Sequence, residues 1–188
     1  PLLEWYKKQT DCEVCGLAAN VGHTAFWHPI FQEEFHRNYD KEFALTDSDI
    51  SIKPVPHDWP EVLSYGVLMS GATKCGLSLD VRHIPGKAIY WPQLQNGAPE
   101  FWSPEKRIVL GNGHRYYDTP TDTTFAVYKP GAPYRIDGWR ADYPHTALHL
   151  PWHLVFSEVL SSHDIQIEFN SEHAYYVEHA SPSSGMAH

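Results

Sequence analysis

The chain has 188 residues, which is enough for one sizeable core and too few for two ordinary domains. Its formal net charge of -9 argues against a nucleic-acid partner, because such partners are held by basic residues that contact phosphates. No apolar run approaches the ~18 residues of a membrane span, and no signal-peptide pattern opens the chain. We therefore expect a cytoplasmic protein without a transmembrane segment.

The N-terminal part predicts a helix, a strand and a second helix. Residues 1–10 have the apolar spacing of a short amphipathic helix, residues 12–18 suit a strand, and residues 25–38 suit a helix with Pro29 in its first turn. An α/β domain normally opens with a strand, so we expect a leading strand upstream of Pro1.

The three cysteines favour no disulfide framework. Cys12 and Cys15 form a C-x-x-C pair, but no second pair exists to close a zinc site. We interpret both as ordinary residues of the predicted strand.

Residues 42–51, EFALTDSDIS, are the stretch around which we expect the domain to be organised. Four of the first five residues suit a strand buried on both faces, and Asp47 and Asp49 follow where that strand ends. Ligands of open α/β sheets bind at this end of a strand. Two carboxylates in D-x-D spacing can hold one Mg²⁺ or Mn²⁺ together with substrate phosphates. The alternative is that these residues only form a turn or cap a helix.

Further elements follow this stretch. Asp58 suits the N-cap of a helix over residues 58–69, and strands are predicted over residues 74–81 and 123–128. Residues 83–117 show no clear period, which is typical of a functional loop. We expect a helix over 154–160, a short strand over 165–169 and a disordered tail over 180–188.

Three histidines, His145, His149 and His153, lie within nine residues beside Pro151 and Trp152. That density is hard to explain by core packing. It marks residues 143–153 as a candidate site.

Three blocks of the sequence carry a family resemblance. They are DSD at 47–49, DTPTDTTFAVYKPG at 118–131 and RADYPHTALHLPWH at 140–153. In this order they resemble the nucleotide-sugar-dependent glycosyltransferases of GT-A fold, and more closely a group of small bacterial and viral members. The similarity runs from residue 1 to about residue 181. It implies an α/β fold with a mixed, mainly parallel, Rossmann-like sheet flanked by helices. One domain would span residues 1–180, with a tail over 181–188. The strand with which such domains usually begin is not found after Pro1.

The resemblance also implies a donor site. Asp47 and Asp49 would hold a divalent metal on the diphosphate of a nucleotide-sugar, and His149 matches a further metal ligand late in the chain, which favours Mn²⁺ over Mg²⁺. Ser48 and His145 would help to bind the donor. His145 and His153 are also reserve metal ligands.

A clamp on the donor phosphates is expected from Arg140, and less so from Arg135. The alternative for both arginines is an ordinary surface charge.

For an inverting transfer, the resemblance points to Asp122 as the general base that accepts the proton of the acceptor hydroxyl. Asp118 is the alternative base or an acceptor-binding residue, and it could equally be a turn residue. Trp91 and Trp102 would stack on an acceptor sugar, or pack beneath their loop.

The sequence thus predicts a metal-dependent glycosyltransferase that moves a sugar to a glycan or another hydroxyl acceptor. One alternative is a non-catalytic sugar- or nucleotide-binding module of the same fold. Another is a metal-dependent hydrolase built on Asp47, Asp49 and His149, which would consume water and need no acceptor.

Overall fold

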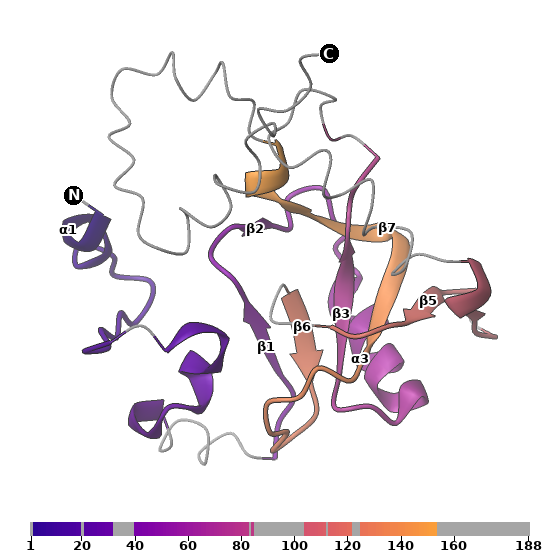
Figure 1. Ribbon diagram of the computed structural model, residues 1–188, viewed down its shortest axis with the longest axis horizontal. Coiled ribbons are helices and arrows are strands. Elements are labelled where there is room, and N and C mark those ends of the chain that lie inside the picture. The colour runs from indigo at the N-terminus through magenta and orange to yellow at the C-terminus, as the bar shows by residue number, and fades with distance from the viewer. Residues whose placement is uncertain are drawn as a thin grey trace, which may run out of the picture.

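A computed structural model describes residues 2–19, 21–31, 40–82, 84, 104–111, 113–121 and 125–153. Its centre is one sheet with the strand order β1-β6-β3-β7-β5-β4, and β2 pairs with β7 off this path (Figure 1). The strands are β1 (Phe43–Thr46), β2 (Ile50–Ser51), β3 (Lys74–Leu79), β4 (Arg107–Val109), β5 (Arg115–Asp118), β6 (Phe125–Tyr128) and β7 (Trp139–His149). The helices and 3-10 turns are α1 (Leu2–Tyr6), η1 (Gly22–Trp27), η2 (Pro29–Phe31), α3 (Trp59–Ser70), η3 (Pro104–Lys106) and η4 (Leu150–His153).

The predicted α/β class is confirmed, but the mainly parallel sheet is wrong. Of the six strand pairings among the described residues, only β3 with β7 is parallel. The reason is that β6 runs between β1 and β3 against both, while β4 and β5 form an antiparallel pair. Nevertheless β1, β3 and β7 run in the same direction, so their carboxyl ends meet at one edge of the sheet.

Helix α3 and the sheet enclose the first of the two hydrophobic cores found among the described residues. Its apolar residues recur at helical spacing, and Val62, Leu63 and Val67 are buried against one face. Leu63 is 0% exposed, and burying such a side chain contributes about 1.5–3 kcal/mol. Gly71 ends the helix in the left-handed conformation, with φ of 69°. The predicted helix over residues 58–69 is therefore confirmed.

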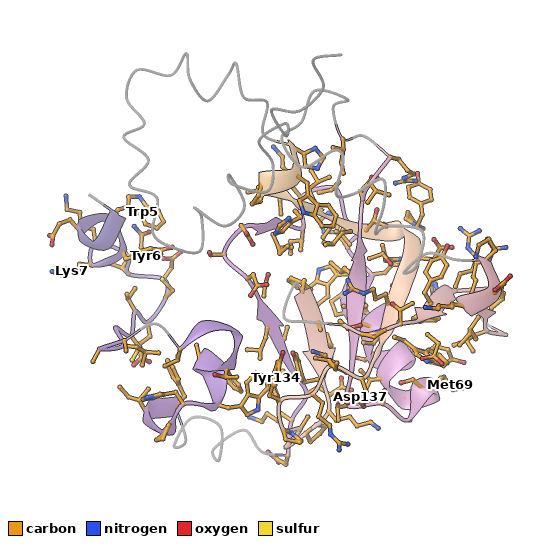
Figure 2. The ribbon with its side chains drawn as sticks, viewed as in Figure 1. Trp5, Tyr6, Lys7, Met69, Tyr134 and Asp137 are labelled. Carbon is orange, nitrogen blue, oxygen red and sulfur yellow. The ribbon has the colours of Figure 1, made fainter. Side chains whose placement is uncertain are left out.

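The second core lies on the other face of β6. Its members are Ala126, Tyr128 and Ala132, with Trp27, Phe43 and Leu45 packed against them. Lys74 is fully buried beside it and donates from Nζ to the Tyr128 hydroxyl at 3.1 Å. Figure 2 shows Tyr134 and Asp137 at this end of the sheet, away from η4. Because η1 and β1 both reach this core, the N-terminal segment lies along the β1 side of the sheet (Figure 1).

Strand β1 confirms the prediction of a strand before Asp47, but it is not the central, doubly buried strand expected there. It ends the described strand order, and its residues alternate between half-buried and exposed. The fully buried strand is β3, whose six residues are all buried. The alternation in β1 follows because Phe43 and Leu45 pack against the second core, whereas Ala44 and Thr46 point to the opposite face, which is exposed there.

Two N-terminal predictions differ from the structure. Residues 12–18 form no strand, since no described strand pairs with them and an isolated strand is not stable. The described part of the expected helix over 25–38 forms only the 3-10 turns η1 and η2. The break falls at His28, which is extended with ψ of 142° because Pro29 follows it.

Several predictions fall outside the described residues. They are most of the loop over 83–117, the helix over 154–160, the strand over 165–169 and the tail. The described part of that loop is not irregular, since it contains η3, β4 and most of β5. Within the described part of the chain, no helix is long and apolar enough to cross a membrane.

Candidate functional site

The residues of the D-x-D motif form a turn at the edge where β1, β3 and β7 end. The Ile50 amide donates to the Asp47 carbonyl at 3.4 Å, and so closes the turn that contains Ser48 and Asp49. Ser48 is exposed, and the two aspartates are half-buried. The turn therefore presents Asp47, Ser48 and Asp49 at the sheet edge predicted for ligands.

The short β2–β7 ladder brings this turn to the end of β7. Ile50 pairs with His149, and the Leu150 amide donates to the Asp49 carbonyl at 2.9 Å. As a result, His149 Nε2 lies 3.3 Å from Asp49 Oδ2. Two residues that the sequence analysis proposed as metal ligands are thus side by side, although they are far apart in the chain.

The surroundings of this pair are partly open. The Asp49 side chain is 42% exposed and that of His149 is 21% exposed. The His149 ring packs edge-on against Trp152 of η4, with ring centroids 4.9 Å apart. Its Nδ1 is buried and has no hydrogen-bond partner among the described residues. Packing by Trp152 orients the ring, and Nε2 remains directed at Asp49.

The spacing of these two atoms is that of a direct ion pair, and it is also compatible with two ligands of one cation. Ligands at neighbouring corners of an octahedron, each ~2.1 Å from the metal, lie about 3.0 Å apart. The 3.3 Å between Asp49 Oδ2 and His149 Nε2 is close to this value. The described residues contain no group of three or more His, Cys, Asp or Glu side chains arranged to hold a metal ion, so Asp47 does not complete a triad in this arrangement.

A second histidine on β7 forms a different pair. His145 Nε2 lies 2.8 Å from Asp58 Oδ1 at the start of α3, and the ring of His145 meets that of His114 at 5.8 Å. His145 belongs to residues 142–145, which the register of β7 against β3 skips between Ala141 and Thr146. The structure therefore directs His145 to α3 and does not bring it to Asp49.

Asp58 also differs from its predicted role. It occupies the N-cap position of α3, but its side chain makes no capping hydrogen bond. The hydrogen bond with His145 lowers the pKa of Asp58 below its ordinary value of 3.8, and this exceeds the smaller opposing effect of desolvation. The Asp58 carboxylate therefore connects the start of α3 to β7 and does not cap the helix.

Arg140 and Asp118 lie at the opposite end of β7 from His149. Arg140 pairs with Gly76, is buried, and donates from Nε to the Pro120 carbonyl at 2.9 Å. Asp118 ends β5 opposite Trp139. The structure does not bring either residue together with the Asp49–His149 pair.

Arg135 is exposed and lies 4.0 Å from Asp137 at the far end of the sheet. This is an ordinary surface ion pair. Its position gives no support to a phosphate clamp.

Three other predicted site residues, Trp91, Trp102 and Asp122, lie outside the described residues. The strand that follows Asp122 is described, and it begins with Phe125 paired to Thr46, the residue before Asp47. His153 is half-buried in η4, next to Trp152.

The sequence analysis missed a polar group at the end of β3. Asp80 accepts three hydrogen bonds from Arg82, from the backbone amide at 2.9 Å, from Nε at 3.0 Å and from Nη2 at 2.7 Å. This carboxylate raises the pKa of Arg82, whose guanidinium lies 3.9 Å from the Tyr143 ring centroid. The D-x-R spacing after a buried strand was the available signal.

The chain was also compared with known proteins. No protein-family model matches it. No curated protein and no solved structure matches it either.

Proposed function

We propose that this chain is a metal-dependent glycosyltransferase that moves a sugar from a nucleotide-diphosphate-sugar to a hydroxyl acceptor such as a glycan. The observation that carries the proposal is the approach of His149 Nε2 to Asp49 Oδ2 at 3.3 Å. This approach depends on the pairing of β2 with β7, and it lies beside Asp47 at the sheet edge where ligands bind in α/β proteins.

In this proposal Asp49 and His149 hold the cation. Asp47 lies in the same turn but completes no triad in the described arrangement, so its side chain would have to move to join them. Two carboxylates and one imidazole favour Mn²⁺, with Mg²⁺ as the alternative. When bound, the cation stabilises the negative charge that gathers on the leaving nucleoside diphosphate, which contributes several kcal/mol. Ser48 is exposed between the two aspartates, and its hydroxyl would donate a hydrogen bond to the nucleotide-sugar.

We assign the general base to Asp122. Support comes from the pairing of Phe125 with Thr46, since it brings the start of β6 next to the D-x-D turn. A carboxylate within hydrogen-bond reach of the acceptor hydroxyl would take up its proton, which increases the rate by ~10²–10⁴. Such a base would give inversion at the sugar carbon.

The test is thermal stabilisation of the protein by a panel of nucleotide-sugars, with and without Mn²⁺. A donor present at ~100 times its dissociation constant stabilises the folded state by about 2.7 kcal/mol. We expect one donor class to raise the melting temperature only when Mn²⁺ is present. The double variant Asp47→Asn, Asp49→Asn should lose this shift, because it has no carboxylate left in the turn.

The matched control is Asp40→Asn, which removes an exposed carboxylate that precedes β1. It should keep the full Mn²⁺-dependent shift. No shift with any donor in the wild type would contradict the proposal, and so would an equal shift in the double variant. If transfer is then assayed with the donor found, Asp122→Asn should bind that donor but not transfer its sugar.

A further inference from the structure

The segment from Asp49 to Asp58 contacts β7 through both of its ends. At one end, His149 Nε2 lies 3.3 Å from Asp49 Oδ2. At the other end, His145 Nε2 lies 2.8 Å from Asp58 Oδ1. Two histidines on one strand thus contact the first and the last residue of the same segment.

Between these ends the backbone makes few contacts with β7. Strand β2 has only two residues, and these pair with Leu148 and His149. The chain then turns, with the Val55 amide bonded to the Ile52 carbonyl at 2.9 Å, and Val55 enters the core. So short a ladder is a weak attachment, because each backbone hydrogen bond contributes little in net terms. Val55 in the core, with Ile50 and Ile52 packed against it, also holds the segment, so the contacts at its two ends act together with this packing.

The Asp58–His145 contact is well suited to that task. The His145 side chain is 7% exposed, and its ring is also held by His114 from the turn between β4 and β5. Asp58 is fixed at the start of α3, a helix packed in the main core. The contact therefore joins β7 to a rigid element rather than to a loop.

We propose that Asp58 and His145 are positioning residues: their contact holds residues 49–58 against β7 and so keeps Asp49 beside His149. Neither residue touches the proposed cation. Their effect on it passes through the β2–β7 ladder. Only the effect on cation binding rests on the proposed function. The effect on the β2–β7 ladder does not depend on it.

Amide hydrogen exchange on the full chain tests the proposal directly. The Leu150 amide, bonded to the Asp49 carbonyl at 2.9 Å, reports opening of the segment from β7. The Asp80 amide, bonded to the Ala147 carbonyl at 2.8 Å, reports the neighbouring β3–β7 pairing and serves as the internal reference. We expect His145→Ala to speed exchange at Leu150 about tenfold and to leave Asp80 nearly unchanged.

Two variants separate positioning from general destabilisation. His145→Gln keeps a side-chain donor that can reach Asp58, so it should restore much of the protection at Leu150. Asp58→Ala is the second variant. It removes the acceptor of this hydrogen bond from a side chain that is 56% exposed, so it tests the contact even if His145→Ala does not fold. His57→Ala, which removes the exposed neighbouring histidine, is the control and should exchange like the wild type.

The outcomes are distinct from those of the proposed function. Unchanged exchange at Leu150 in both Asp58→Ala and His145→Ala would overturn the positioning role. Equal acceleration at Leu150 and Asp80 would also overturn it, because the contact would then stabilise only the whole fold. If the wild type binds no Mn²⁺ but Leu150 responds as expected, the proposed function fails and the positioning role stands. In a Mn²⁺-binding protein, His145→Ala should also weaken Mn²⁺ affinity about tenfold, with recovery in His145→Gln.

Discussion

The two histidine–aspartate pairs on β7 use the same chemical groups in different surroundings. His145 and Asp58 are 2.8 Å apart, and the histidine side chain is only 7% exposed. His149 and Asp49 are 3.3 Å apart, and the histidine side chain is 21% exposed. The first pair is shorter and its histidine is more buried, although its Asp58 side chain is 56% exposed against 42% for Asp49 in the second pair. We therefore assign to the first pair a role in holding the fold, and to the second the proposed role in binding a cation.

The largest expected effect comes from His149→Ala. Removing a proposed ligand should weaken Mn²⁺ binding by at least about a hundredfold, since loss of an outer-shell partner alone costs about 10–100-fold. The free energy of unfolding should change little, because the site is partly open. Isothermal titration with Mn²⁺ and urea unfolding measure the two quantities. A large loss of stability with unchanged Mn²⁺ affinity would reverse the roles given to the two histidines.

His145→Ala should have the opposite profile. It removes a buried ring and its hydrogen bond to Asp58, so we expect the free energy of unfolding to fall by about 1–2 kcal/mol. Its effect on Mn²⁺ affinity should be smaller than that of His149→Ala. Urea unfolding of both variants under one condition gives the comparison. If the two variants lose equal stability, the distinction between the pairs is wrong.

The smallest effect is the dependence of the Asp58 contact on pH. The folded-state pKa of Asp58 lies below its ordinary value of 3.8, so its contribution to stability is complete above that value. The contribution is lost as the pH falls through the lowered folded-state pKa. The stability difference between wild type and Asp58→Asn should therefore be constant near neutral pH and should shrink below pH 3.8. A difference that grows with acidity would contradict the assigned contact.

Much of the fold could be predicted from local pattern. The helical spacing of Val62, Leu63 and Val67 predicted α3, and the apolar run before Asp47 predicted β1. The β-rich stretch before Tyr128 likewise predicted β6. These elements follow from side chains that are near one another in sequence, so the sequence alone contains the necessary information.

The arrangement of the strands could not be predicted in the same way. The family resemblance implied a mainly parallel sheet, but β6 enters between β1 and β3 and runs antiparallel to both. Strand order depends on contacts between residues far apart in the chain. The same is true of the expected strand over residues 12–18, which has no described partner.

For the candidate site, the sequence indicated which residues take part better than it indicated what each of them does. The D-x-D turn and His149 were named from the sequence, and the β2–β7 register brings Asp49 and His149 together. His145 was grouped with His149 because the two are neighbours in sequence. Residues 142–145 of β7, which the register with β3 skips, direct His145 to Asp58 instead. No local sequence pattern indicates such a change of register.

Pulsed electron paramagnetic resonance of the Mn²⁺-loaded protein tests the central claim most directly, because it detects the nitrogen of a histidine bound to the ion. We predict coupling to one imidazole nitrogen in the wild type, in His57→Ala and in His145→Gln, and its loss in His149→Ala. A Mn²⁺ signal without nitrogen coupling, or a coupling that survives in His149→Ala, would contradict the assignment of Asp49 and His149 as a shared cation site.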